Sequence, residues 1–370
     1  MITPPATLGI LGGGQLGRYF VIAARTMGYG TIVLEPDPDA PAGKVADEHI
    51  VAGFDDESAL RHMASACAVV TTEFENPPAA SMHWLTQHTI VHPSPSAVAV
   101  AQDRRSEKSF LINSGIPVAP CTTIETDDDV IAAAAFHYPA ILKTARLGYD
   151  GKGQLSVAGH GQLADAWSQL DRRPSVLEQR LSLDGEVSVV LARDERGQIA
   201  TFPTAHNSHV NGILDCTVVP YSTPGATDLG AEVAAALDYV GVLAVEMFIV
   251  GGRLLVNELA PRPHNSGHWT LDAARTSQFE QQVRAVCGVG LGDPSICAPA
   301  VAMVNLLGDL WANGEPDWSA ALADPDASLH LYGKTSARPG RKMGHLTVTA
   351  ETPDEAEVRA KAIRAGLTAR

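Results

Sequence analysis

The segment LGILGGGQLGR (residues 8–18) sets the architecture of the N-terminal part of this chain. Its pattern is typical of an apolar strand, a glycine turn and the start of a helix. Gly12, Gly14 and Gly17 fit G-x-G-x-x-G, and Glu35 follows at the end of the next apolar run, TIVLE. This is the spacing of a dinucleotide-binding fingerprint. The same glycines also suit another anionic or flat ligand at a helix N-terminus, so NAD is one of two alternatives.

The surrounding residues, from 7 to about 92, alternate apolar runs with amphipathic helical patterns. The runs are TLGILG, TIVLE, HIVAG and AVVTTEF, and helical patterns occupy residues 18–27, 57–66 and 79–88. Strand–helix alternation predicts a parallel sheet that is covered on both faces. We therefore expect a Rossmann-like domain over residues 1–100, with its boundary near the Pro-rich HPSPS.

The rest of the sequence shows a different pattern of predicted helices and strands. A helix is expected to end near Gly115, followed by a small α/β unit with strands in AILKTA, LSVAG and SVLEQRL. From Gly185 onward apolar runs separated by turns, one of them at Arg196–Gly197, predict antiparallel strands. Further helices are expected over residues 228–238 and 353–365. The fold class is therefore α/β combined with α+β, with a second domain over 101–297 and a small β-rich domain over 298–370.

The composition excludes several classes of protein. The 370 residues carry a formal net charge of −15, which argues against a nucleic-acid binder or a protein that binds anionic membranes. A small anion held by a few local cations remains compatible. The five cysteines form no C-x-x-C pair, and no apolar run approaches 18 residues, so we expect a cytoplasmic chain without a membrane span. Lys44, Lys108 and Lys361 are expected to be solvated surface charges.

Two acidic residues interrupt the apolar stretch LAVEMFIVGGRLLVNELAP (residues 243–261). A three-residue loop, 251–253, would place Glu246 opposite Glu258, whereas a two-residue loop would place Asn257 opposite Glu246. Facing carboxylates in apolar strands repel each other and are costly to desolvate. A hard cation such as Mg²⁺ removes this conflict. We therefore predict a metal site at Glu246 and Glu258; the alternative is that one glutamate points to solvent.

The segment LKTARLGYDGKGQ (residues 142–154) places a lysine at a strand end before a glycine loop. Glycine backbone N–H groups can close over phosphate oxygens while lysines supply positive charge. The pattern is not a Walker A loop, because no G-K-[ST] opens a helix. An ordinary Asp-Gly hairpin turn is the alternative.

Four further segments gather polar residues: TTEFENPP (71–78), VLEQRLSLDGE (176–186), NELAPRPHNSGHWT (257–270) and YGKTSARPGRKMGH (332–345). The last is a cationic cluster in an acidic chain, for which a substrate phosphate is a natural partner. The alternatives are, in the same order, a helix N-cap at Asn76, a solvated strand end, a buried polar turn and a solvated basic loop.

Together these segments resemble the ATP-grasp ligases, and among them the N5-carboxyaminoimidazole ribonucleotide synthetases of purine biosynthesis. The resemblance runs over nearly the whole chain in consistent order. NELAPRPHNSGHWT and GYDGKGQ are its specific motifs, whereas GGGQLG is not specific. It implies an ATP-grasp fold with a pre-ATP-grasp N-terminal domain and a small lid over about residues 115–182. Lys152 departs from the family, which usually has Arg there, so a bidentate contact becomes a point charge.

The resemblance also implies a set of binding residues. The ATP-binding residues would be Arg104, Lys143, Gly148, Tyr149, Asp150, Gly151, Lys152, Gly153, Gln154, Glu178, Gln179, Arg180, Leu181, Glu186, His209, Asn257 and Glu258. The aminoimidazole ribonucleotide (AIR) would contact Gln15, Leu16, Glu73, Asn76, Lys334, Arg341 and Lys342. The residues around the reacting groups would be Tyr149, Asp150, Lys152, Arg262 and His264. The expected metal is Mg²⁺ or Mn²⁺, and a homodimer is expected.

The implied reaction is an ATP-dependent carboxylation. Bicarbonate attacks the γ-phosphoryl group of ATP to give carboxyphosphate and ADP, and carboxyphosphate or its CO₂ then meets the exocyclic amine of AIR. Asp150 is a candidate acceptor for the amine proton. The alternatives are an NAD-dependent oxidoreductase, a non-catalytic nucleotide sensor, and a formate-dependent glycinamide ribonucleotide transformylase. The oxidoreductase leaves the glutamate pair and the cationic cluster unexplained.

Overall fold

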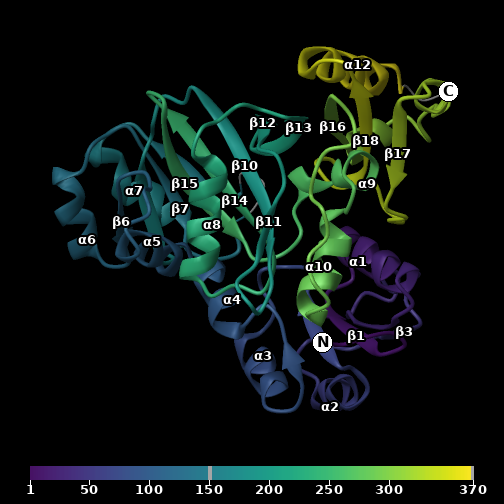
Figure 1. Cartoon of the computed structure of the whole chain (residues 1–370). Coiled ribbons are helices and arrows are strands. Elements are labelled where there is room, and N and C mark those ends of the chain that lie inside the picture. The colour runs from purple at the N-terminus through teal and green to yellow at the C-terminus, as the bar shows by residue number, and fades with distance from the viewer. Residues whose placement is uncertain (149–151, 368–370) are drawn as a thin grey trace.

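The computed structural model describes residues 1–148 and 152–367. Tyr149, Asp150 and Gly151 therefore lie outside the described residues. Figure 1 shows the N-terminal domain (purple and blue), the small lid around β6 and β7, and a large sheet that runs between the lid and α12. Among the described residues, no helix is long and apolar enough to cross a membrane.

The N-terminal domain is a five-stranded parallel sheet in the order β3-β2-β1-β4-β5, which confirms the predicted Rossmann-like architecture. Its strands are β1 (Thr7–Leu11), β2 (Gly30–Leu34), β3 (Glu48–Ile50), β4 (Val69–Thr72) and β5 (Ile90–Val91). Its helices are α1 (Gln15–Thr26), α2 (Glu57–Ala66) and α3 (Ala79–Thr86). Gly12 has a φ of +100°, which lets the chain turn sharply from β1 into α1.

Two helices lead from this domain to the rest of the chain: α4 (Pro95–Gln102) and α5 (Arg104–Asn113). The Ser94 side chain caps α4 and the Asp103 side chain caps α5. Gly115, with a φ of +73°, follows α5 as the sequence predicted. Asn76 does not cap α3, because Pro78 occupies the N-cap position.

The lid contains a four-stranded antiparallel sheet in the order β6-β9-β7-β8. Its elements are β6 (Cys121–Ile124), α6 (Asp127–Ala132), β7 (Ala140–Thr144), β8 (Gln154–Val157), α7 (Leu163–Gln169) and β9 (Ser175–Gln179). Leu142, Leu177 and Trp167 are buried together between this sheet and its helices. The burial gives the lid its own small core, so it can carry Lys143 and Glu178 as a unit.

The large sheet has nine strands in the order β15-β14-β10-β12-β13-β16-β18-β17, with β11 paired to β10. The strands are β10 (Gly185–Arg193), β11 (Ile199–Thr201), β12 (Ala205–Val210), β13 (Ile213–Val219), β14 (Gly241–Val250), β15 (Arg253–Ala260), β16 (Ala300–Leu307), β17 (Ala327–Leu331) and β18 (Lys342–Ala350). The turn at Arg196–Gly197 joins β10 and β11 as predicted. The β-rich C-terminal strands extend this sheet through β13 rather than forming a separate one.

Helices cover the large sheet and connect it to the N-terminal domain. They are α8 (Ala226–Ala236), α9 (Thr270–Ala273), α10 (Gln278–Cys287), α11 (Ser319–Ala323) and α12 (Pro353–Gly366). Val283 and Val286 of α10 pack into the core of the N-terminal domain beside Leu8 and Phe20. Figure 1 shows α10 lying between α1 and the large sheet. Because α10 contacts both α1 and β14, it joins the N-terminal domain to the strand that carries Glu246.

Candidate active site

A cleft of about 640 Å³ lies where the N-terminal domain, the lid and the large sheet meet. It brings together many of the residues that the sequence predicted: Gln15, Leu16, Asn76, Arg104, Lys143, Gly148, Lys152, Gln154, Glu186, His209, Glu246, Asn257, Glu258, Arg262, His264 and Lys342. Elements more than 300 residues apart along the chain therefore share one cavity. A cavity of this size is suited to small-molecule ligands.

Glu246 and Glu258 pair directly across β14 and β15. The turn between the strands has two residues, since Val250 pairs with Arg253, and this turn alone would place Asn257 opposite Glu246. The register shifts by one residue at Asn257, as in a β-bulge, and restores the pairing of the two glutamates. The predicted pairing is confirmed, but the three-residue loop proposed for it is wrong.

Each of the two glutamates has a different basic partner. Glu246 Oε1 lies 3.1 Å from His264 Nε2, and Glu258 Oε2 lies 3.0 Å from Arg104 Nη2. Burial tends to raise the pKa of Glu246, but the hydrogen bond from His264 outweighs it and lowers that pKa to about 2. Glu246 is therefore a carboxylate at neutral pH. The buried Oδ1 atom of Asn257 has no hydrogen-bond partner among the described residues, so an unused oxygen accompanies the pair.

A buried ion cluster lies between the lid and α5. Glu178 Oε2 accepts a hydrogen bond from Lys143 Nζ at 2.5 Å, and Glu178 Oε1 lies 3.3 Å from Lys108 Nζ. Lys108 also donates to the carbonyl oxygen of Asn257 at 2.8 Å. Although burial opposes ionisation, the two lysines lower the pKa of Glu178 to about 2. The prediction that Lys108 is a surface charge is wrong, because only 3% of it is exposed.

Glu107, which the sequence analysis did not single out, also lines the cleft. Its Oε1 atom accepts the backbone N–H of Leu259 at 2.7 Å, whereas its Oε2 atom is buried without a hydrogen-bond partner in residues 1–148 and 152–367. Burial raises the pKa of Glu107 to about 7 despite the nearby charge of Lys108. The sequence signal was Glu107 and Lys108 side by side in a helix with apolar neighbours, but helical periodicity could not show which side chain is buried.

Glu186 and His209 face each other across the cleft wall, with Oε2 and Nδ1 3.2 Å apart. Burial opposes protonation of His209, but the Glu186 carboxylate raises its pKa overall. Two of the expected ATP-binding residues are therefore neighbours. Glu186 is partly exposed to the cleft and keeps carboxylate oxygen available for a ligand hydroxyl.

The glycine loop at the start of α1 already binds carboxylates of this chain. Glu73 accepts the backbone N–H groups of Gly14 and Gly17, the latter at 2.7 Å, and Glu35 accepts that of Gly13 at 2.9 Å. These are the donors that a dinucleotide phosphate would use at a helix N-terminus. Burial raises the pKa of Glu73 even though both amides favour its charged form. The fingerprint is therefore satisfied from within the protein.

Beside this loop, the wall of the cleft is formed by Glu75 rather than by Glu73. Glu75 forms an ion pair with Arg262, and burial lowers the pKa of that guanidinium to about 10. Glu75 belongs to the polar segment TTEFENPP but is not among the expected site residues. Residues 73–75 form bends after β4 rather than part of the strand. Strand alternation would place Glu73 and Glu75 on the same face, so it could not show which of them lines the cleft.

Of the predicted C-terminal cations, Lys342 lines the cleft. Lys334 donates to the carbonyl oxygen of Lys342 at 2.7 Å, and Arg341 donates to the carbonyl oxygen of Ser336 at 2.8 Å. The predicted residues that do not line the cleft are Glu73, Gly153, Glu178, Gln179, Arg180, Leu181, Lys334 and Arg341. Their ligand-binding roles stay predictions, as do those of the residues 149–151 outside the described part of the chain.

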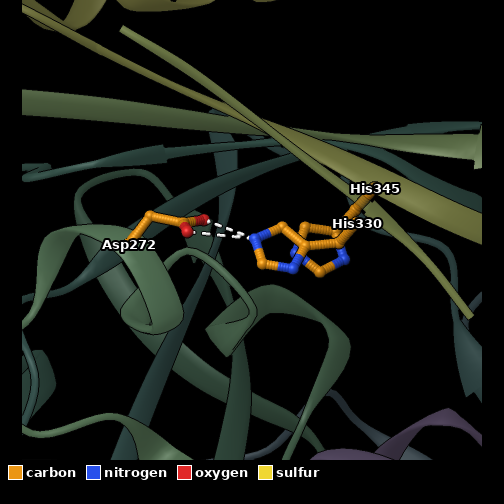
Figure 2. Close-up of side chains that lie close together, drawn as sticks. All are labelled: Asp272, His330 and His345. Carbon is orange, nitrogen blue, oxygen red and sulfur yellow. Dashed lines mark hydrogen bonds and ion pairs between the residues drawn. The ribbon is translucent and has the colours of Figure 1, made fainter. Parts of the chain in front are cut away.

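A cluster of Asp272, His330 and His345 lies where α9, β17 and β18 meet. Figure 2 shows the Asp272 carboxylate facing the ring of His330, 3.0 Å from its Nε2 atom, with the His345 ring close to it. The rings of His330 and His345 stack 4.4 Å apart at 12°. Imidazole lone pairs lie in the ring plane, so two nearly parallel rings do not converge on one ion. We therefore interpret the cluster as a packing contact between α9 and the C-terminal strands β17 and β18.

Comparisons with known proteins agree with this geometry. Family profiles match in chain order: a ribonucleotide synthetase preATP-grasp domain over residues 5–102, an ATP-grasp domain over 109–279, and a phosphoribosylaminoimidazole carboxylase C-terminal domain over 301–359. The N5-carboxyaminoimidazole ribonucleotide synthase of Bacillus subtilis is 42% identical over 362 residues, which are 96% of this chain and 94% of that protein.

Solved structures of the same kind superpose over nearly the full length. The ADP complex of an N5-carboxyaminoimidazole ribonucleotide synthetase is 38% identical with a TM-score of 0.92, covering 98% of this chain and 97% of that one. The Aspergillus clavatus enzyme in complex with ADP and 5-aminoimidazole ribonucleotide is 28% identical with a TM-score of 0.87, covering 98% of both chains. The chain therefore belongs to the N5-carboxyaminoimidazole ribonucleotide synthase family of ATP-grasp ligases.

Proposed function

We propose that this chain carboxylates 5-aminoimidazole ribonucleotide with bicarbonate and ATP, and that the cleft between its three domains is where this happens. The observation that carries the proposal is the pairing of Glu246 with Glu258 in a cleft that also holds Lys143 and Lys342. The acidic residues of this cavity can hold a metal ion with the phosphates of a nucleotide. The basic residues can bind phosphate groups, including that of a second substrate in the same cavity.

The residues around the glutamate pair fit Mg²⁺ or Mn²⁺. Glu246 is held as a carboxylate, Glu258 faces it, and the unpartnered Oδ1 of Asn257 adds an oxygen of the type that hard cations prefer. When bound, the cation would neutralise charge on the ATP phosphates. Arg104, which now pairs with Glu258, would be placed to share that charge with the phosphates.

The chain's own residues then have distinct tasks. Lys143 extends from the lid strand β7 and, together with the backbone of the loop that starts at Gly148, would stabilise charge on the transferring phosphoryl group. Glu186 would hold the ribose with His209 nearby, and the strand that carries Glu178 would border the adenine. Bicarbonate would attack the γ-phosphoryl group to form carboxyphosphate and ADP.

The aminoimidazole ribonucleotide would lie along the opposite wall. Gln15, Leu16 and Asn76 line the same cavity as Lys342, whose ammonium group would contact the substrate's phosphate. Arg262 and His264 also line the cleft. Asp150 remains our candidate acceptor for the proton of the exocyclic amine. A closed lid would keep water from the labile carboxyphosphate.

The deciding experiment is a phosphate-release assay with purified protein. Release should require AIR, bicarbonate and Mg-ATP together, and it should saturate with bicarbonate. Release that proceeds with glycinamide ribonucleotide and formate instead would contradict the proposal in favour of a transformylase. Thermal stabilisation by Mg-ATP but not by NAD is expected as well; stabilisation by NAD alone would support an oxidoreductase.

We also propose a homodimer in the cytoplasm. The dimer rests on family resemblance, and light scattering of the purified chain would test it. The five cysteines are all free thiols, three of them buried, which is compatible with a reducing compartment. Localisation of a tagged chain would test that assignment.

A further inference from the structure

A chain of hydrogen bonds runs through the interior of the large sheet and ends at the proposed metal site. Thr217 Oγ1 donates to Asn207 Oδ1 at 2.9 Å, and Asn207 Nδ2 donates to Ser188 Oγ at 2.9 Å. Ser188 Oγ donates to Ser266 Oγ at 2.8 Å, which lies 2.8 Å from His264 Nδ1. His264 Nε2 then reaches Glu246 Oε1.

The four residues that precede His264 in this series of hydrogen bonds are buried. Thr217, Ser188 and Ser266 are 0% exposed and Asn207 is 4% exposed. They come from three neighbouring strands, β13, β12 and β10, and from the turn after β15. Buried polar groups that are fully paired hold a unique arrangement, since any alternative leaves one of them without a partner. These buried hydrogen bonds therefore fix the orientation of the His264 ring.

The direction of the hydrogen bonds is set at His264. The backbone N–H of Ser266 donates to His264 Nδ1 at 3.3 Å, and a backbone amide can only donate. Nδ1 therefore accepts, and the ring proton is on Nε2. The Ser266 hydroxyl accepts from Ser188, so its own proton also points to Nδ1. Both donors favour the same tautomer.

We infer that Ser266, Ser188, Asn207 and Thr217 are positioning residues that hold His264 in the Nε2–H tautomer, so that it donates a hydrogen bond to Glu246. This polarity is opposite to that of a Ser-His-Asp triad, in which a carboxylate accepts from Nδ1–H and leaves Nε2 as the base. His264 is therefore a hydrogen-bond donor that orients Glu246, and Oε2 of that glutamate is the atom left for a cation. The role of Glu246 rests on the proposed function, whereas the tautomer does not.

The tautomer can be measured directly in the full-length, metal-free protein. Nitrogen-15 NMR of histidine-labelled protein separates protonated from unprotonated ring nitrogens, and the His264→Gln variant identifies the signals of His264. We expect an unprotonated Nδ1 and a protonated Nε2. A protonated Nδ1 would overturn the inference. A wild type with the expected tautomer but without AIR-dependent phosphate release would overturn the proposed function alone.

Two variants test whether the buried hydrogen bonds position His264. Ser266→Ala leaves only the backbone N–H on Nδ1, so the two tautomers should become mixed and Mn²⁺ affinity, measured by electron paramagnetic resonance, should fall about fivefold. Ser188→Ala should shift the same signals less, and it carries the test if Ser266→Ala does not fold. Ser175→Ala is the matched control, since Ser175 is 0% exposed and its hydroxyl donates to the carbonyl oxygen of Arg173, away from His264 in the sequence and on the lid strand β9. Unchanged nitrogen signals and Mn²⁺ affinity in both test variants would refute the positioning role.

Discussion

Glu246 lies directly opposite Glu258 because Asn257 bulges out of β15. Without the bulge, the two-residue turn would place Asn257 opposite Glu246 and turn Glu258 toward the other face of the sheet. One extra residue thus creates the facing pair of carboxylates. It also leaves the Asn257 carbonyl for Lys108 and the Asn257 side-chain oxygen beside the pair.

Replacing Glu258 by Gln should remove metal-dependent turnover. Glu258→Gln keeps the size of the side chain but loses the charge that faces Glu246 and pairs with Arg104. We expect phosphate release to fall roughly 100-fold or more, since stabilising developing charge is the largest catalytic contribution. Glu357→Gln on α12, whose carboxylate pairs with Lys361, is the control. Near-normal activity of Glu258→Gln would refute the metal assignment.

Lys342→Ala should act on AIR binding rather than on the chemical step. Loss of one charge-assisted contact to a phosphate is worth about 1.5–3 kcal/mol, so the KM for AIR should rise roughly tenfold or more while kcat stays within about twofold. Lys361→Ala removes a surface lysine that pairs with Glu357 and should leave both constants unchanged. A KM that does not move would exclude Lys342 from the phosphate site.

Glu107 should make stability depend on pH. Its folded pKa of about 7 exceeds its ordinary 4.5, so the folded state holds the proton more tightly. The contribution of Glu107 to stability is therefore full below pH 4.5 and is lost as pH rises to 7, at about 1.4 kcal/mol per pKa unit. Glu107→Gln cannot ionise, so its melting temperature relative to the wild type should rise over this range and then level off. Parallel curves for the two proteins would contradict this assignment.

Glu178→Gln should destabilise the protein strongly, because it leaves Lys108 and Lys143 buried without a counter-charge. Breaking a buried pair in this way costs about 3–5 kcal/mol. Calorimetric melting of the metal-free protein would measure it. Glu125→Gln removes an exposed partner of Arg105 and should change stability by less than about 1 kcal/mol. Equal effects of the two substitutions would argue against a buried ion cluster.

Gly14→Ala tests whether the glycine loop is built around Glu73. A Cβ atom on Gly14 would lie 2.6 Å from Glu73 Oε1, so the carboxylate must move off the loop. We expect a loss of about 1–3 kcal/mol, seen as a lower melting temperature. Gly159→Ala is the control, since its Cβ would meet nothing within 4 Å. If both variants melt like the wild type, the loop tolerates a side chain and the contact is not structural.

Much of the fold could be predicted from local patterns. The alternation before residue 92 predicts the parallel sheet of β1 to β5, and Gly115 marks the predicted end of α5. These features depend on neighbours within a few residues, where periodicity and backbone preference act. The motifs that line the cleft were also visible, because polar residues in apolar surroundings stand out whatever the fold.

Other features arise only from long-range packing. The burial of Lys108 depends on Glu178 and Asn257, which approach it from the lid and from β15. Glu73 satisfies the glycine loop because β4 lies beside β1, so the fingerprint could not reveal that its donors are already used. The strand pattern of the sequence is compatible with two registers of β14 and β15, and it could not show that a bulge at Asn257 selects the one that pairs the two glutamates. Local sequence determines which elements form and which residues are chemically unusual, whereas desolvation and pairing across domains determine the charge and partner of each residue in the site.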